Sequence, residues 1–220
     1  MVRKVFNTIL SKYGVRFSNR EYVKNKSVWQ SDNVYSYKYY LELDNVAKYF
    51  LNDIDNTVCN SDAILDICCN IGRHINYLCD RGYTNVHGFD IMQQAIDKMP
   101  QYFPNIPIKN IQLGNIVEIL PNYKSDSFDW AYTHSATIEL VPPFFQTHLH
   151  LHRIVNKGLI LLLNSNRNPY PRYYKYLFED AGFITCKHER VKSSKSYYFD
   201  LYHFIKEDYL DEYHKTKLIY

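Results

Sequence analysis

Glycine is scarce in this chain, and long apolar runs are missing. Only 7 of the 220 residues are glycine, so each glycine marks a place where the backbone needs unusual freedom. No stretch approaches the roughly 20 apolar residues that a membrane-spanning helix needs. The N-terminal residues include basic side chains but neither a sustained apolar core nor a small-residue cleavage site, so we expect no signal peptide.

An excess of charge of one sign is also missing. The chain has 26 Lys and Arg against 23 Asp and Glu, and the two signs are interspersed. Nucleic-acid-binding proteins usually carry a basic patch or stripe, so this balance argues against a nucleic-acid partner. The five cysteines form no CxxC motif and no paired framework. This usage favours reduced thiols in a cytoplasmic protein.

From about residue 61, strand patterns alternate with helix patterns. Short apolar runs predict strands at residues 63–66, 85–90, 106–115, 127–134 and 158–164. Helical spacing predicts helices at residues 71–79, at 91–99 with Pro100 as the stop, at 148–154 and at 170–183. Two final strands, at residues 184–191 and 197–206, are joined by a short polar turn and should pair antiparallel at one edge. This order predicts a mostly parallel sheet with helices on both faces.

Residues 1–60 show no strand pattern and are rich in Tyr, Asn, Lys and Ser. Residues 37–54 are predicted to form one amphipathic helix, whose apolar positions are Tyr40, Leu41, Val46, Phe50 and Leu51. We therefore expect an N-terminal helical extension over residues 1–60, packed as a lid over the ligand edge of a domain formed by residues 61–220.

Residues 64–78 read ILDICCNIGRHINYL, an apolar run that ends in an acid, a short loop and a helix. In an open parallel sheet, ligands bind beyond the carboxyl ends of the strands. Gly72 permits a close backbone approach there, and Asp90 ends the next strand, where its carboxylate can accept hydrogen bonds from ribose hydroxyls. A pyrophosphate needs close backbone contacts at the helix start, which Asn70 and Ile71 crowd. The loop therefore favours a nucleoside ligand over a dinucleotide.

In motif order and spacing, residues 62–205 resemble the class I S-adenosylmethionine-dependent methyltransferases. The first motif of that family, acid-x-Gly-x-Gly-x-Gly, reads here Asp66-Ile-Cys68-Cys-Asn70-Ile-Gly72. The second acid is Asp90, in VHGFDIMQQAI, and the third region is LGNIVEILPNYKSDSFDWAY, with Asn115 in the usual acidic place. The stretch LFEDAGFITCKHE is similar to the segment before the sixth strand of the family. The resemblance implies a three-layer α/β/α Rossmann-like fold with an antiparallel edge strand pair.

The resemblance also implies S-adenosylmethionine as the cofactor. Its binding residues would be Asp66, Cys68, Asn70, Gly72, Asp90, Ile91, Asn115, Ile116 and Thr133. Cys68 and Asn70 replace glycines, but asparagine is the next best residue for a left-handed backbone and cysteine is small. Asp66 is suited to receive the cationic methionine tail. We expect a pocket that still binds the cofactor although two glycines of its motif have been replaced. The alternatives are a fold that no longer binds the cofactor and a site for a different nucleotide.

Candidates for chemistry follow the fourth and fifth strands. His134 is the first candidate for a catalytic base, because of its position and the near-neutral pKa usual for histidine, and Glu139 is the second. The candidates for binding the acceptor are Asn166, Arg167 and Tyr170 after the fifth strand, and Trp29 and Tyr35 in the extension. Arg167 hints at an anionic or carboxylate-bearing acceptor.

The alternating histidines of HLHLHRI, residues 148–154, suggest a metal site. The helix predicted for this segment argues against one. Three histidines at alternate positions share a face only on a strand, so we expect no metal site. The leading hypothesis is methyl transfer to a small-molecule acceptor in the cytoplasm, without a membrane partner. Alternatives are an RNA methyltransferase and a non-catalytic binding module that keeps the fold, since fold does not fix chemistry. The sequence leaves the oligomeric state open.

Overall fold

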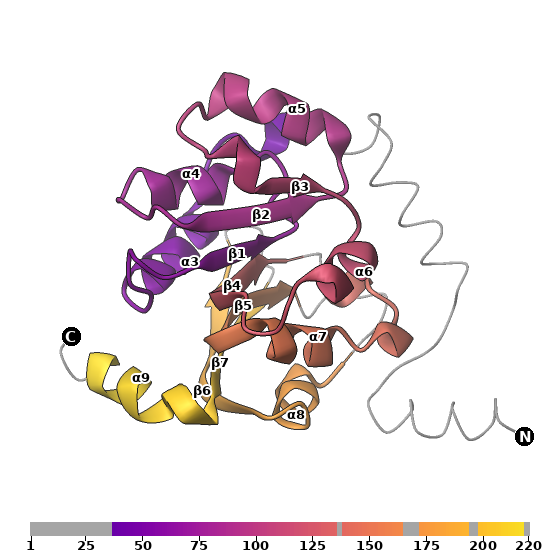
Figure 1. Cartoon of the computed structure of the whole chain (residues 1–220). Coiled ribbons are helices and arrows are strands. Elements are labelled where there is room, and N and C mark those ends of the chain that lie inside the picture. Colours follow the sequence, from indigo (N-terminus) through magenta and orange to yellow (C-terminus); the bar gives the residue numbers. More distant parts are fainter. Residues whose placement is uncertain (1–36, 136–137, 165–171, 194–197, 218–220) are drawn as a thin grey trace, which may run out of the picture.

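The computed structural model describes residues 37–135, 138–164, 172–193 and 198–217, and these residues build one seven-stranded sheet. Its strand order is β3-β2-β1-β4-β5-β7-β6 (Figure 1). The strands are β1 (Ile64–Ile67), β2 (Val86–Asp90), β3 (Ile111–Leu113), β4 (Phe128–His134), β5 (Val155–Asn164), β6 (Phe183–Lys192) and β7 (Tyr198–Lys206). The first five run parallel, whereas β7 pairs antiparallel with both β5 and β6. The antiparallel edge pair predicted from the short turn is therefore confirmed.

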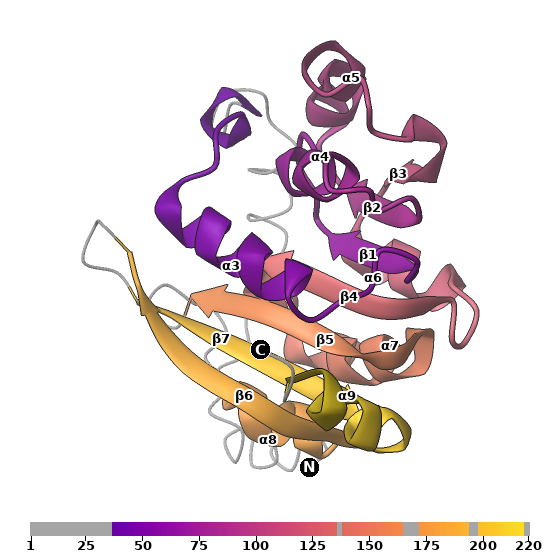
Figure 2. The ribbon, with the colours of Figure 1, turned by 90° about the vertical axis from the view of Figure 1, so that its left-hand side faces the viewer.

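Helices cover both faces of the sheet. One face carries α3 (Asn45–Asp55), α4 (Arg73–Cys79), α5 (Gln93–Tyr102) and α9 (Leu210–Lys217). The other face carries α6 (Ile116–Ile119), α7 (Thr147–Ile154) and α8 (Tyr174–Glu179). Six short 3-10 helices connect these elements among the described residues: Tyr37–Tyr40, Ile108–Asn110, Leu120–Asn122, Ile138–Leu140, Pro143–Phe145 and Glu207–Tyr209. Figure 2 shows α3 lying along the sheet beside β4 and β5. The three-layer α/β/α architecture is as predicted.

Two hydrophobic clusters, one on each face, hold the layers together. On the α3 face, Phe50 and Leu51 of α3 are fully buried in the same cluster as Leu162 of β5. On the α7 face, Leu151 and Phe178 are fully buried in the second cluster. Burying side chains of this size stabilises the fold by roughly 1.5–3 kcal/mol each. The central strands are apolar almost throughout because both of their faces are covered.

Several predicted element boundaries are wrong, and three of them have a clear physical reason. The helix predicted at residues 37–54 is broken: α3 begins only after Asp44, whose side chain accepts a hydrogen bond from the backbone N–H of Ala47 at 2.8 Å and so caps the helix. Pro100 does not stop α5, which continues to Tyr102. Proline removes one N–H, but near the end of the helix the N–H of Phe103 still bonds to the carbonyl of Met99 at 2.8 Å. The third strand is shorter than predicted, since residues 108–110 form a 3-10 helix.

None of the helices in the described part of the chain is both long and apolar enough to cross a lipid bilayer.

Candidate active site

The loop between β1 and α4 adopts left-handed backbone at alternate residues. Cys68, Asn70 and Gly72 have φ angles of 60°, 50° and 83°. These are the three positions at which the sequence motif calls for glycine, so the loop keeps the glycine conformation with two residues that are not glycine. The side-chain oxygen of Asn70 accepts a hydrogen bond from the N–H of Ile71 at 2.8 Å, which supports the left-handed turn.

Gly72 has a packing reason as well as a conformational one. A Cβ atom added there would lie 2.7 Å from the Cδ1 atom of Ile106 and 3.1 Å from the Cε atom of Met99. The glycine therefore lets α4 pack closely against α5 and the segment that follows it. This packing is a reason for glycine that the sequence did not indicate; close approach of the backbone to a ligand stays a prediction.

Asp90 joins the end of β2 to the same loop. One carboxylate oxygen accepts a hydrogen bond from the N–H of Asn70 at 2.8 Å, and the other accepts one from the N–H of Met92 at 2.8 Å. Burial raises the pKa of Asp90, although the backbone N–H groups of Met92, Asn70 and Ile91 act in the opposite direction. Each carboxylate oxygen has a second acceptor direction, so Asp90 can hold the loop and still receive hydroxyl groups of a ligand.

The carboxyl group of Asp66 is buried, and one of its two oxygens makes no hydrogen bond within the described structure. The residue is 1% exposed, and its Oδ2 atom has no hydrogen-bond partner within the described structure. Burial raises the pKa of Asp66 to about 8; nearby Asp90 adds to this rise, and Tyr132 and Arg73 oppose it. Leaving such a buried oxygen without a partner costs about 1–3 kcal/mol. A cationic group beside Asp66 would satisfy it and favour its ionised form.

The remaining predicted cofactor residues surround these two acids. Asn115 is buried and caps α6 through its side-chain oxygen, which accepts from the N–H of Val117 at 3.1 Å. Thr133 is buried on β4 and donates its hydroxyl to the carbonyl of Ile67 at 3.0 Å. Ile116 is also buried, and Ile91 is half-buried. The structure thus gathers the predicted cofactor residues at the carboxyl ends of β1, β2, β3 and β4.

Five rings from four elements meet beside Asp66. We call them the ring cluster: Phe50 of α3, His74 of α4, Tyr132 and His134 of β4, and Phe199 of β7. The imidazoles of His74 and His134 stack with their centroids 5.4 Å apart and their planes at 13°. The centroids of Phe50 and Phe199 lie 5.7 Å and 5.6 Å from that of His134. This cluster covers the end of β4, where the sequence placed a candidate base.

His134 is neutral at physiological pH. Burial lowers its pKa to about 4, with Arg73 acting in the same direction and Asp44 against it. The near-neutral pKa that the sequence suggested is therefore wrong for this histidine, because its environment disfavours the charged form. A neutral imidazole has a free lone pair, but one of low basicity.

Glu139, the second candidate base, is tied to the backbone. It is 2% exposed, and one of its carboxylate oxygens accepts a hydrogen bond from the N–H of Asn164 at 2.7 Å. This contact joins the segment after β4 to the end of β5. Its geometry favours a positioning role over proton transfer.

The five candidate acceptor residues, Trp29, Tyr35, Asn166, Arg167 and Tyr170, lie outside the described residues. Within the described part of the chain, no group of three or more His, Cys, Asp and Glu side chains is arranged to hold a metal ion. His148, His150 and His152 lie on the helix α7, as the predicted helix required.

Sequence reasoning predicted only His134 of the ring cluster as a site residue and missed the other four members: Phe50, His74, Tyr132 and Phe199. His74 directly follows Gly72 and Arg73 at the start of α4, and that adjacency was the available signal. Phe50 and Phe199 lie in separate elements far along the chain, and only the tertiary fold brings them to His134.

Comparisons with known proteins agree with this geometry. Residues 65–163 match the family model of a methyltransferase domain. A search of curated proteins finds no significant match. Among solved structures, magnesium protoporphyrin IX methyltransferase from Synechocystis PCC 6803, with S-adenosylmethionine bound, is similar: 14% identity over 87% of this chain and 100% of that chain, with a TM-score of 0.62.

Two further solved structures widen the comparison. The 1,6-didemethyltoxoflavin-N1-methyltransferase of Burkholderia thailandensis was crystallised with 1,6-didemethyltoxoflavin and S-adenosylhomocysteine. It is 15% identical over 87% of this chain and 92% of that chain, with a TM-score of 0.63. The [4+2]-cyclase SpnF is 9% identical over 73% of this chain and 81% of that chain, with a TM-score of 0.59. At these identities, the likeness shows a shared fold.

Proposed function

We propose that this chain is a class I S-adenosylmethionine-dependent methyltransferase that transfers the methyl group to a small-molecule acceptor. The match of residues 65–163 to a methyltransferase-domain model and the shared fold support this proposal. In this proposal, residues 61–220 form the methyltransferase domain, and residues 1–60 form an N-terminal extension. The part of that extension in α3 supplies Phe50 to the ring cluster.

The observation that carries the proposal is the β1–α4 loop together with the two acids beside it. The loop keeps three left-handed residues, Asp90 fastens it to β2, and the buried Oδ2 atom of Asp66 lacks a partner among the described residues. These groups fit a nucleoside with a cationic tail: Asp90 would hold the ribose, Asn115 the adenine edge and Asp66 the positive end. When bound, S-adenosylmethionine supplies a methyl group that its sulfonium already activates. The protein therefore needs only to align the acceptor and exclude water.

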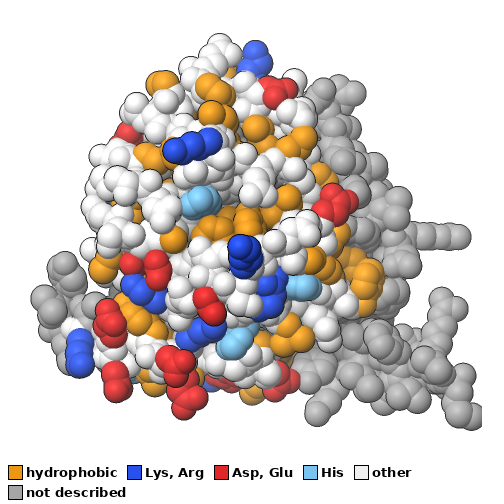
Figure 3. Space-filling view, viewed as in Figure 1, with side chains coloured by type: hydrophobic (Ala, Val, Ile, Leu, Met, Phe, Trp, Pro, Cys, Tyr) orange, Lys and Arg blue, Asp and Glu red, His pale blue; other side chains and the backbone are white. Residues whose placement is uncertain are grey.

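The charge distribution favours a small acceptor over RNA. On the face seen in Figure 3, Lys and Arg side chains are interspersed with Asp and Glu. RNA binding would draw on a contiguous positive surface. All five cysteines lie in the described part of the chain, and no disulfide bond joins any two of them there, in keeping with our proposal of a cytoplasmic protein.

An acceptor-independent assay tests the proposal. The protein is incubated with S-adenosylmethionine and one of three fractions of a cell extract: molecules below about 1 kDa, RNA, or protein. We expect S-adenosylhomocysteine to form above background only with the small-molecule fraction. Product formation with RNA, falling steeply as salt rises, would favour the RNA methyltransferase. Cofactor binding without product in any fraction would favour a binding module.

A further inference from the structure

The interior polar atoms that lack partners are concentrated at one place. Among the described residues, seven buried side-chain atoms have no hydrogen-bond partner, and four of them belong to Asp66, His74, Tyr132 and His134. In the ring cluster, the two ring nitrogens concerned are Nε2 of His74 and Nδ1 of His134. The Tyr132 hydroxyl and Asp66 belong to side chains that interact with each other, so the two imidazoles carry the argument. Nearly all buried polar groups in folded proteins are paired. A concentration of unpaired ones beside a cofactor loop points to a ligand that pairs them.

The ring cluster differs chemically from the two acids of the predicted cofactor site, Asp66 and Asp90. Asp66 suits a cation, whereas the two imidazoles are neutral. Burial lowers the pKa of His74 well below its usual value, and the neighbouring His134 and Arg73 lower it further. The charged groups that act on His134 are Arg73 and Asp44. A neutral imidazole offers one N–H donor and one lone-pair acceptor, and either nitrogen can take either role.

The surroundings of the two imidazoles are flat and apolar. Phe50 lies 6.3 Å from His74 and 5.7 Å from His134, centroid to centroid, and Phe199 lies 5.6 Å from His134. Aromatic rings gain most from partners that stack or meet them edge to face. The two phenylalanines come from α3 and β7 and present apolar rings, without polar atoms of their own, beside the imidazoles.

We propose that the ring cluster binds the methyl acceptor, and that this acceptor is an uncharged planar heterocycle with N–H and carbonyl or ring-nitrogen groups along one edge. His74 and His134 pair with that edge, and Phe50 and Phe199 pack against the ring. This inference rests on the proposed function and deepens it. It assigns His74 to the acceptor, while Asp66 and Asp90 serve the cofactor. A cationic acceptor is disfavoured beside Arg73 and the sulfonium.

The test uses binding and needs no turnover. Lumazine, a planar bicycle with lactam edges, is titrated into the protein without and with saturating S-adenosylhomocysteine; benzylamine, which is cationic, serves as the comparison ligand. The variants are His74→Phe and His134→Phe, which keep a ring and remove the unpaired nitrogens. His214→Phe, on exposed α9, is the matched control. Removing unpaired buried polar atoms should not destabilise the fold, and a thermal melt of each variant checks this.

We expect lumazine to bind the wild type and the His214 variant, and to bind each ring-cluster variant at least tenfold more weakly, while all four proteins bind S-adenosylhomocysteine alike. Equal lumazine binding by all proteins, no lumazine binding by the wild type, or preference for benzylamine would overturn the inference. Loss of S-adenosylhomocysteine binding in the two histidine variants would assign the imidazoles to the cofactor tail and overturn it too. Failure of the proposed function gives a different result, since the wild type would then not bind S-adenosylhomocysteine in the first place.

Discussion

At the scale of single residues, the cofactor loop shows that backbone conformation can persist after its usual residues have changed. Cys68 and Asn70 hold φ angles of 60° and 50° at positions where the family motif has glycine. A left-handed conformation costs a non-glycine residue roughly 1–2 kcal/mol, and less for asparagine. The fold therefore accepts local strain at the loop that faces its ligand, as functional sites often do.

Replacing Cys68 by glycine should relieve that strain. Relief of roughly 1–2 kcal/mol is offset in part by the flexibility that glycine adds to the unfolded chain. We expect Cys68→Gly to be neutral or stabilising by up to about 1 kcal/mol in chemical denaturation, with cofactor binding retained. The matched control is Cys69→Gly, because Cys69 is buried and is not among the residues with positive φ. That variant should lose about 1–3 kcal/mol; equal losses in both variants would contradict the strain argument.

The raised pKa of Asp66 predicts that cofactor binding releases a proton. With a pKa of about 8, its carboxyl is mostly protonated at pH 7 in the free protein. A cationic cofactor tail favours the ionised form, so binding should release about one proton at pH 7. Calorimetric titrations in two buffers with different ionisation enthalpies measure this release, and Asp66→Asn should abolish it. Release of the same number of protons by the wild type and the variant would contradict the assignment of Asp66 to the positive end.

The same pKa fixes the sign of a stability effect. Because the folded protein holds the Asp66 proton more tightly than the unfolded chain does, this group makes stability fall as pH rises from about 4 to about 8. Asp66→Asn should therefore gain stability relative to the wild type across that range, when both are measured without ligand.

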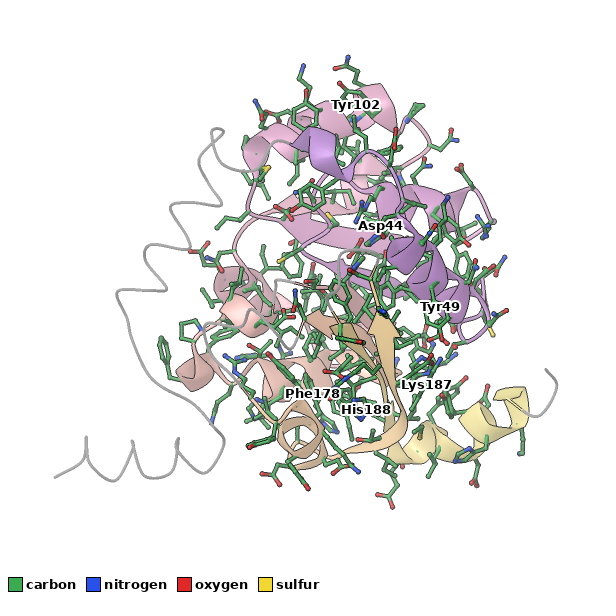
Figure 4. The ribbon with its side chains drawn as sticks, turned by 180° about the vertical axis from the view of Figure 1, so that it is seen from behind. Asp44, Tyr49, Tyr102, Phe178, Lys187 and His188 are labelled. Atoms are coloured by element: carbon green, nitrogen blue, oxygen red, sulfur yellow. The ribbon has the colours of Figure 1, made fainter. Side chains whose placement is uncertain are left out.

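At the scale of elements, α3 is held on the sheet by polar contacts as well as by its apolar face. Asp53 pairs with Lys187 of β6 at 2.5 Å and with the fully buried His203 of β7. The other ring nitrogen of His203 lies 2.8 Å from the hydroxyl of Tyr213, on α9. One turn earlier on α3, Tyr49 donates to Glu189 of β6 at 2.8 Å, and Figure 4 shows Tyr49 and Lys187 on these neighbouring elements. These contacts set the position of Phe50, which lies between Tyr49 and Asp53.

Breaking this attachment should destabilise the protein. The carboxyl of Asp53 is 11% exposed, and interaction with His203 and Lys187 holds its pKa at about 2, against the effect of burial. We expect Asp53→Asn to cost about 1–3 kcal/mol at pH 7. Because the folded pKa lies below the unfolded one, this contribution is present above about pH 4 and disappears as pH falls toward 2.

The control for this variant lies on the same helix. Asp55 pairs with Arg81 at 3.4 Å, and both side chains are partly solvated, at 35% and 41% exposed. Asp55 also accepts a hydrogen bond from the hydroxyl of Tyr83 at 3.1 Å, which the amide oxygen of asparagine can accept as well. An exposed pair contributes little, so Asp55→Asn should change the free energy of unfolding by about 0.5 kcal/mol or less. Equal effects of the two substitutions in urea titrations would show that the attachment of α3 does not depend on Asp53.

At the scale of the whole molecule, the sequence predicted the sheet and its edge pair correctly, and it predicts the place of the cofactor at the carboxyl ends of the first four strands. These depend on local patterns: apolar runs, an acid at a strand end, and Gly72 in the loop after the first strand. The errors arose where local signals compete. An aspartate such as Asp44 can cap a helix or lie within one, and tertiary packing decides which of the two it does. Pro100 is tolerated within α5 because it falls in the last turn of that helix. The ring cluster was beyond prediction, since its members meet only when α3, α4, β4 and β7 are assembled.

The central claim is that the drifted loop still binds S-adenosylmethionine, and calorimetric titration of that cofactor tests it most directly. The wild type should bind with a dissociation constant in the micromolar range. Asp90→Asn removes the charge that holds the loop and should weaken binding by at least tenfold, since one lost charged hydrogen bond is worth about 1.5–3 kcal/mol. Asp97→Asn, an exposed acid on α5, should bind as the wild type does. Absence of binding by the wild type, or equal binding by all three proteins, would contradict the account.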